Sequence, residues 1–293
     1  MIQGFKESNL KVFCDGTLGA GGHANAILSA HPEIETFLGF DQDLSAHSIA
    51  KQTLAPFENK VTYIHSNFAH ISDQLKLHKI KQVDGFFFDI GVSSMQLDQK
   101  DRGFSFREDA PLDMRMDQSK GRSASHVLEE LSEKELGEIF REYGEVPFWK
   151  RAAEEITHVR KTQPIETTKQ LSDIITNMLG GRGKIHPATL IFQALRIYVN
   201  RELEVLEQGL LQALDHLAPE GMIGVISFHS LEDRIVKNIF RDASTPIRDD
   251  RGKKVADSPF ELVGKRPIAP SFEEVKKNKR ARSAKLRWIR RKK

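Results

Sequence analysis

The sequence predicts an α/β fold: a parallel sheet covered by helices, with an all-helical domain inserted into it. Four short apolar runs alternate with helix-like stretches in the first ninety residues, which is the pattern of a parallel sheet with helices on both faces. A glycine-rich turn directly follows the first run. About a hundred residues then show helical stretches and no strand-like run, which indicates the insertion.

The expected strands follow the chain in order. They are Val12–Cys14, Thr36–Phe40, Val61–Ile64, Val83–Phe88, Met222–Phe228 and a final one near Ala284–Ile289. The fourth is apolar throughout, as a central strand should be. It ends in Asp89, and the carboxyl edge of a central strand is where α/β sheets place their chemistry.

The insertion is expected to span residues 98–185, and residues 1–97 and 186–293 to form the sheet domain. Ser132 with Glu135 and Thr167 with Gln170 have the spacing of capping boxes that begin helices. Gly180–Gly183 reads as a flexible break. A single helix is expected from Pro187 to Leu217, because its apolar stripe continues at core spacing.

The rest of the chain is expected to be irregular. Phe104–Asp117 is a charge-dense loop, and Thr245–Pro270 is rich in proline and charge. In and beside the first loop lie three arginines, Arg102, Arg107 and Arg115. They either contact a bound partner or pair with the aspartates of the same loop, and the sequence does not separate these alternatives. The aspartates are Asp109, Asp113 and Asp117.

Composition describes a globular protein with one large domain or two small ones. The 293 residues are 39% hydrophobic and 29% charged, enough to bury a substantial core. No stretch approaches the roughly 20 apolar residues of a membrane span, and the start lacks the apolar core of a signal peptide. The single cysteine excludes an internal disulfide framework. A cytoplasmic protein is the simplest expectation.

The turn Asp15–His23 is the most informative segment. Gly19, Gly21 and Ala24 match the dinucleotide pattern G-x-G-x-x-A, which alone favours a nicotinamide cofactor. Asp15 argues against it, because a carboxylate facing the turn would repel a pyrophosphate. S-adenosylmethionine instead carries a sulfonium and an ammonium, which an acid attracts. The segment also fits the D-x-G-x-G-x-G turn of methyltransferases, with Thr17 in place of the first glycine. The turn therefore favours the methyl donor, with a turn that binds no ligand as a further alternative.

Four other positions are candidates for the same site. Asp41 follows the second strand where an acid would hold ribose hydroxyls, although Asp43 is an alternative. Phe68 either packs near the adenine or belongs to the core. His23 either bonds the donor's carboxylate or merely sits on the first helical turn. Asp89 either contacts the methionine portion, accepts a proton from an amine being methylated, or caps a helix.

Charge is distributed unevenly. From Lys276 to Lys293 there are eleven Lys and Arg and no acid, which leaves 33 basic against 41 acidic residues elsewhere. The natural partner of such a patch is a polyanion, the alternative being a solvated tail with no partner. Trp288 and Ile289 favour an ordered segment, because disordered arms rarely carry such residues.

Other catalytic signals are weak. Cys14 lies inside a strand and is expected in the core, so it is a poor nucleophile. Methylation of a pyrimidine ring carbon generally needs a cysteine, whereas methylation of an amine does not. Ser227, His229 and Asp233 lack a surrounding G-x-S-x-G elbow. The eleven histidines show no H-E-x-x-H spacing, so no catalytic metal is expected.

Several longer motifs resemble one family over nearly the whole chain, that of the ribosomal small-subunit RNA cytosine methyltransferases called RsmH, formerly MraW. The motifs are Asp15–His23, Asp89–Asp98, Arg102–Phe106, Pro111–Asp117, His186–Thr189, Phe192–Ile197 and Ser227–Arg234. The resemblance implies a class I Rossmann-like methyltransferase sheet with a helical domain inserted after the fourth strand. It also implies methyl transfer from S-adenosylmethionine to the exocyclic amine of a 16S rRNA cytosine at the decoding centre.

The family's donor-binding positions fall on seven residues of this chain. They are Gly21, Gly22, His23, Asp41, Phe68, Asp89 and Gln96. Assigned to the donor, Asp89 keeps its role as proton acceptor only as a secondary hypothesis. The insertion is expected to recognise RNA, and the partner that Arg102, Arg107 and Arg115 would grip, if they do not pair with the aspartates of their loop, is this RNA. Whether the chain forms a homodimer is left open.

Two segments depart from the family pattern. Members usually carry a His-x-Pro-Val-Leu segment before the first strand, and this chain begins almost at that strand. The segment is expected to help close the donor site, so its absence should lower activity. The usual Asn-Pro-Arg reads Asn278-Lys279-Arg280, which loses a rigid turn, adds charge and should preserve RNA binding.

Two other functions remain as alternatives. One is a methyltransferase that acts on a protein or a small molecule, and the other is an RNA-binding ribosome-assembly factor without turnover. An RNA substrate predicts binding that weakens steeply with salt. The assembly factor predicts no methyl transfer to undermethylated 30S subunits.

Overall fold

The computed structural model describes residues 2–180 and 186–293. The chain divides into two compact units. We call Met1–Gly91 with Leu203–Lys293 the sheet unit, and Val92–Glu202 the helical unit. The insertion predicted from the sequence, residues 98–185, is shorter at both ends than the helical unit. The difference arises because α10 (Ala188–Asn200) packs against α6, α7 and α9 and contributes its apolar stripe to the core of the helical unit.

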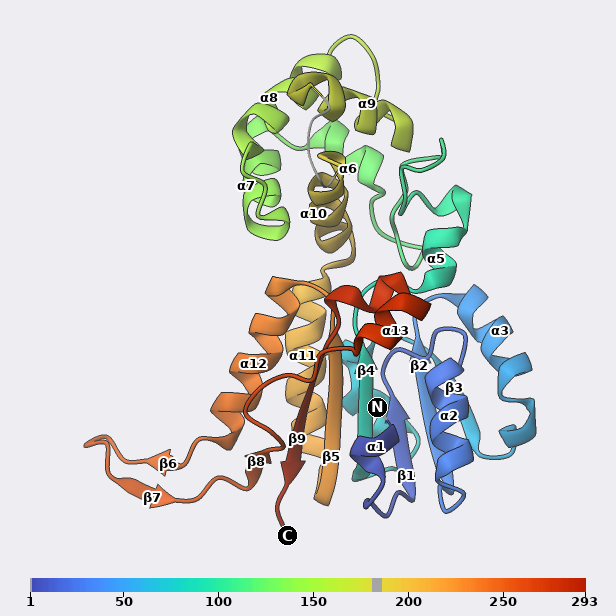
Figure 1. Ribbon diagram of the computed structural model, residues 1–293, viewed down its shortest axis with the longest axis vertical. Helices are drawn as coiled ribbons and strands as arrows, with labels where there is room; N and C mark the ends of the chain where they lie inside the picture. The colour runs from blue at the N-terminus through green and yellow to red at the C-terminus, as the bar shows by residue number, and fades with distance from the viewer. Residues whose placement is uncertain (1, 181–185) are drawn as a thin grey trace. The chain divides into compact units, whose positions relative to one another are not determined.

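The sheet unit is built on a seven-stranded sheet of order β3-β2-β1-β4-β5-β9-β8, shown in Figure 1. The strands are β1 (Val12–Asp15), β2 (Thr36–Asp41), β3 (Val61–His65), β4 (Val83–Asp89), β5 (Leu217–Ser227), β8 (Phe260–Leu262) and β9 (Lys285–Arg291). The first five are parallel to one another. Strand β9 pairs antiparallel with β5, and β8 pairs antiparallel with β9. The predicted α/β fold and its six strands are confirmed. The strand order reverses between β1 and β4, which is where open α/β sheets bind ligands.

Helices cover both faces of this sheet. They are α1 (Ile2–Phe5), α2 (Gly22–Ala30), α3 (Leu44–Thr53), α4 (Ile71–Leu77), α11 (Glu202–His216) and α12 (Ser230–Ser244). A further helix of this unit, α13 (Phe272–Lys277), buries no residue. Phe86 and Phe88 point into the core beneath α4, α11 and α12, and Phe87 points into the core beneath α2. This alternation is the period of a strand buried on both faces. Cys14 is fully buried in the first of these cores, as expected.

Two expectations for the sheet unit were wrong. The helix expected from Pro187 to Leu217 is interrupted at Arg201, whose φ of 50° ends α10 before α11 begins. The two halves bury their apolar stripes in different units, so one continuous pattern concealed a break. The stretch expected to be loop contains β8 and the hairpin of β6 (Ile247–Arg248) and β7 (Lys254–Ala256). These strands are short and mostly exposed, so they lack an apolar pattern.

The helical unit has its own core. Its helices are α5 (Ser94–Asp98), α6 (Ala124–Glu130), α7 (Glu133–Gly144), α8 (Trp149–Val159), α9 (Thr168–Leu179) and α10. Both predicted capping boxes are present, at Ser132 and Thr167. Gly180 ends α9 with a φ of 71°, while residues 181–183 of the predicted break lie outside the described residues. Across residues 2–180 and 186–293, every helix is too short or too polar to span a membrane.

Candidate cofactor-binding site

The glycine-rich turn joins the carboxyl end of β1 to α2. Gly19 and Gly21 have φ values of 51° and 81°, a region that favours glycine. Gly21 precedes the first residue of α2 and provides no side-chain cap. The first N–H groups of this helix therefore face the turn without a side-chain partner, which suits an anionic group.

Asp41 ties this turn to the end of β2. One carboxylate oxygen accepts the Gly19 N–H at 2.8 Å, and the other accepts the Asp43 N–H at 2.9 Å. Asp43 itself is buried and caps α3 by accepting the Ser45 N–H at 3.0 Å. The geometry therefore favours Asp41 over Asp43 as the ribose ligand, an assignment that stays a prediction.

Asp89 lies at the end of β4, beside the same turn. Its N–H donates to the Thr17 hydroxyl at 2.7 Å, and its Oδ2 lies 3.5 Å from His23 Nδ1. Its Oδ1 is buried and has no hydrogen-bond partner among the residues that the structure describes. This bond was not predicted from the sequence, where Thr17 was noted only as a replacement for glycine. A glycine could not make this bond.

Three carboxylates with raised pKa values surround the turn. Burial, with the charges of Asp89 and Asp41, raises the pKa of Asp15 to about 7 against a hydrogen bond from Thr17. Burial and the charge of Glu232 raise the pKa of Asp89 to about 7. Burial also raises the pKa of Asp41, although two backbone hydrogen bonds oppose it. Each negative charge makes the others costlier, so a cation bound here would relieve the repulsion.

Gly22 marks open space beside these groups. A Cβ built on Gly22 meets no atom within 4 Å, whereas one on Gly16 would lie 2.3 Å from the Phe88 ring. Open space at the start of α2 and the unpartnered Oδ1 of Asp89 are both features of a ligand site. The acids suit the ammonium and sulfonium of S-adenosylmethionine, and the helix start suits its carboxylate. The residues present therefore fit this cofactor.

Phe68 and Gln96 are placed differently. Phe68 follows β3, and its ring packs edge-on against Phe88 at 5.4 Å between centroids. It therefore contacts the core and also lies at the edge of the sheet that carries the turn. Gln96 belongs to the helical unit, where it forms a capping box with Ser93. The donor-binding roles of both residues stay predictions.

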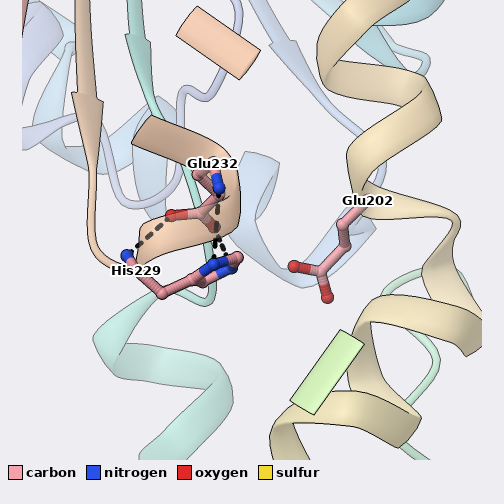
Figure 2. A group of neighbouring side chains, drawn as sticks. All are labelled: Glu202, His229 and Glu232. Atoms are coloured by element: carbon pink, nitrogen blue, oxygen red, sulfur yellow. Dashed lines mark hydrogen bonds and ion pairs between the residues drawn. The ribbon is translucent and has the colours of Figure 1, made fainter. Parts of the chain in front are cut away.

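At the start of α12 a partly buried histidine lies against a buried glutamate, as Figure 2 shows. His229 caps the helix, and its Nε2 lies 2.9 Å from Glu232 Oε1. Glu232 is fully buried and accepts the N–H groups of Phe228 and His229. Asp233 binds Lys285 and Arg287 instead of His229. These contacts give His229 and Asp233 structural roles and leave no hydrolase-type triad with Ser227.

The loop arginines of the helical unit have separate roles. Arg115 binds Asp113 through two nitrogens, at 2.9 and 2.8 Å. Arg102 is buried and donates to the backbone carbonyls of Arg115 and Met116. Arg107 is exposed. Two of the three arginines therefore hold the loop together, and only Arg107 faces solvent as an RNA contact would.

The C-terminal basic segment, Lys276–Lys293, is ordered and falls into two parts. In β9, Trp288 and Ile289 are buried, Lys285 and Arg287 bind Asp233, and Arg290 binds Glu261. In the part before β9, the cations at four positions are exposed and make no salt bridge with any residue in the described ranges. They are Lys276, Lys277, Lys279 and Arg282. The expectation of an ordered segment is confirmed, and four of its cations without a salt bridge lie before the strand.

Comparisons with known proteins agree with one another. The sequence profile of the MraW methylase family matches residues 1–292. A protein named Ribosomal RNA small subunit methyltransferase H from Chlamydia trachomatis serovar D is 48% identical over 287 residues, covering 97% of this chain and 91% of that protein. Proteins of the same name are 47% identical in Chlamydia felis, covering 98% and 93%, and 45% identical in Geobacter sp. strain M21, covering 99% and 95%.

Among solved structures, an rRNA methylase from Streptococcus thermophilus aligns with a TM-score of 0.45 at 8% identity, covering 100% of this chain and 93% of that chain. A likeness at this level carries no argument.

Proposed function

The chain belongs to the MraW methylase family, and we propose that it transfers a methyl group from S-adenosylmethionine to a ribosomal RNA base. The acceptor is the exocyclic amine of a cytosine in the 16S rRNA of the small subunit. The observation that carries this proposal is the cluster of Asp15, Asp41 and Asp89 at the switch point of the sheet, which fits a cationic cofactor. A substrate in the ribosome implies a reaction in the cytoplasm.

The sheet unit supplies the groups that would hold the donor. Asp41 is oriented by the N–H groups of Gly19 and Asp43, so its remaining lone pairs can accept the ribose hydroxyls. Gly22 and His23, at the start of α2, would meet the carboxylate of the donor. Phe68 would bound the adenine. When bound, S-adenosylmethionine supplies a methyl group on a positively charged sulfur.

Asp89 would act on the incoming amine. The lone pair of a cytosine amine is delocalised into the ring, so its reaction needs in-line placement and an acceptor for its proton. The amine would form a bond to the methyl carbon as the bond from that carbon to the sulfur breaks, with S-adenosylhomocysteine as the leaving group. The Asp89 carboxylate would accept the proton that the amine loses. A pKa raised to about 7 suits this task near neutral pH. His23, at 3.5 Å, would orient the carboxylate.

A transfer assay tests this proposal. The chain is incubated with S-adenosylmethionine labelled on its methyl group and with 30S subunits from cells that lack this activity. Label is expected in the 16S rRNA, and nucleoside digestion should return N4-methylcytidine. Donor binding without any transfer would indicate the assembly factor, and label recovered in protein would indicate the other methyltransferase.

A further inference from the structure

The segment between β8 and β9 carries an exposed aromatic ring. Phe272 is the first residue of α13 and is 79% exposed. An isolated exposed Phe costs free energy in water, since burial of such a ring is favourable. Two acids, Glu273 and Glu274, follow it in the first turn, and α13 ends with Lys276 and Lys277. Lys276 is at i+4 from Phe272, on the same face of the helix.

Side chains of the segment cap its two short helices. Ser271 caps α13 by accepting the Glu274 N–H at 3.1 Å, and Asn278 accepts the Arg280 N–H at 3.1 Å at the start of the 3-10 helix η4 (Lys279–Ser283). Ala281, within η4, is buried. Phe272 is thus presented on an ordered element.

The sheet register places this segment at the edge that carries the candidate site. Lys285, the first residue of β9, pairs with Ser227, the last residue of β5. On the other side of β5, Ile226 pairs with Asp89. The chain entering β9 therefore arrives at the carboxyl edge of the parallel strands, where Asp15, Asp41 and Asp89 lie.

We propose that α13 and η4 bind the single-stranded RNA beside the target cytosine, with the Phe272 ring stacked on an unpaired base. Lys276, Lys277, Lys279 and Arg282 would meet its phosphates. An aromatic ring among unneutralised cations is how proteins bind single-stranded nucleic acid, and phosphates complement charges that acids of the chain leave free. This inference rests on the proposed function and names the surface that holds its substrate.

The test compares four variants in two measurements. The first is binding to a short single-stranded RNA oligonucleotide that carries 2-aminopurine, whose fluorescence reports stacking. The second is methyl transfer to undermethylated 30S subunits. Phe272→Ala and Phe272→Leu should raise the RNA dissociation constant and the KM for 30S by about 5- to 100-fold, the range of one lost stack. Phe272→Trp should retain both. Leu77→Ala, at another exposed apolar residue, at 70% on α4, is the matched control and should change neither.

The outcomes separate this inference from the proposed function. Donor binding, measured by calorimetry, should be equal in all four variants. If Phe272→Ala binds RNA and methylates 30S as well as the parent chain, or if Phe272→Leu is as good as Phe272→Trp, base stacking is refuted while the methyltransferase stands. If the parent chain itself transfers no methyl group, the proposed function fails.

Discussion

Two regions of the sheet unit, the turn after β1 and the strand β9, hold their charged side chains in different ways. At the turn after β1, the carboxylates of Asp15 and Asp41 accept backbone N–H groups, and the Asp89 carboxylate lies beside His23. No Lys or Arg of the described residues pairs with these three acids. In β9, by contrast, Asp233 and Glu261 neutralise three cations. The paired charges of β9 therefore stabilise the fold, whereas other charges stay available for ligands. The acids of the turn would suit a cationic cofactor, and the cations before β9 would suit a polyanion.

The largest expected effect is at Asp41. Asp41→Ala removes the acceptor of two backbone hydrogen bonds and the proposed ribose ligand, so donor affinity should fall at least about 100-fold, the loss expected for charge-assisted hydrogen bonds. Calorimetry with S-adenosylmethionine measures it. Asp73→Ala, at an 83% exposed side chain of α4, is the matched control. Normal turnover in the Asp41 variant would refute the assignment.

A smaller effect is expected where the turn is open. Gly22→Ala adds a methyl group into space that the chain leaves empty, at a position without positive φ. We expect an unchanged melting temperature and donor affinity reduced by about tenfold, because a blocked contact costs on the order of 1 to 2 kcal/mol. Gly21→Ala is the contrast, since its φ of 81° strains the alanine, and it should lower the melting temperature as well. Full donor affinity in Gly22→Ala would place the donor elsewhere.

The three acids of the turn also predict that donor affinity depends on pH. Because the pKa of Asp89 is raised to about 7, the ligand-free chain takes up a proton as the pH falls through 7. A bound cation favours the ionised form, so donor affinity should fall by up to about tenfold per pH unit below pH 7 and level off above it. Calorimetry from pH 5.5 to 8.5 measures this. Asp89→Asn should make the profile shallower without abolishing it, because the pKa of Asp15 is also raised to about 7. An affinity that rises toward acid pH would contradict the cation-binding role.

These contrasts also explain what the sequence could predict. The strands and the glycine turn are local patterns, so Val12–Cys14 and Asp15–His23 were identified correctly as strand and turn. The ion pairs of β9 join residues far apart in sequence, and the run of eleven cations therefore read as one patch. The bond from Asp89 to Thr17 likewise depends on the pairing of β1 with β4. The break at Arg201 was not predicted, because the apolar stripe continues through it.

The smallest expected effect compares the two parts of the basic segment. Lys279→Gln removes an unneutralised cation, so the logarithm of RNA affinity should depend less steeply on the logarithm of salt concentration, by about 0.7 in slope for one single-strand phosphate contact. Its melting temperature should not change. Arg287→Gln instead breaks the partly buried pair with Asp233, so it should lower the melting temperature by a few degrees, as a loss of about 1 kcal/mol does, and leave the salt slope unaltered. Each variant should therefore change one measurement and not the other, because a charge that the fold already neutralises has no counterion to release. A reduced salt slope in Arg287→Gln and an unchanged one in Lys279→Gln would mean that RNA binds β9 rather than the segment before it.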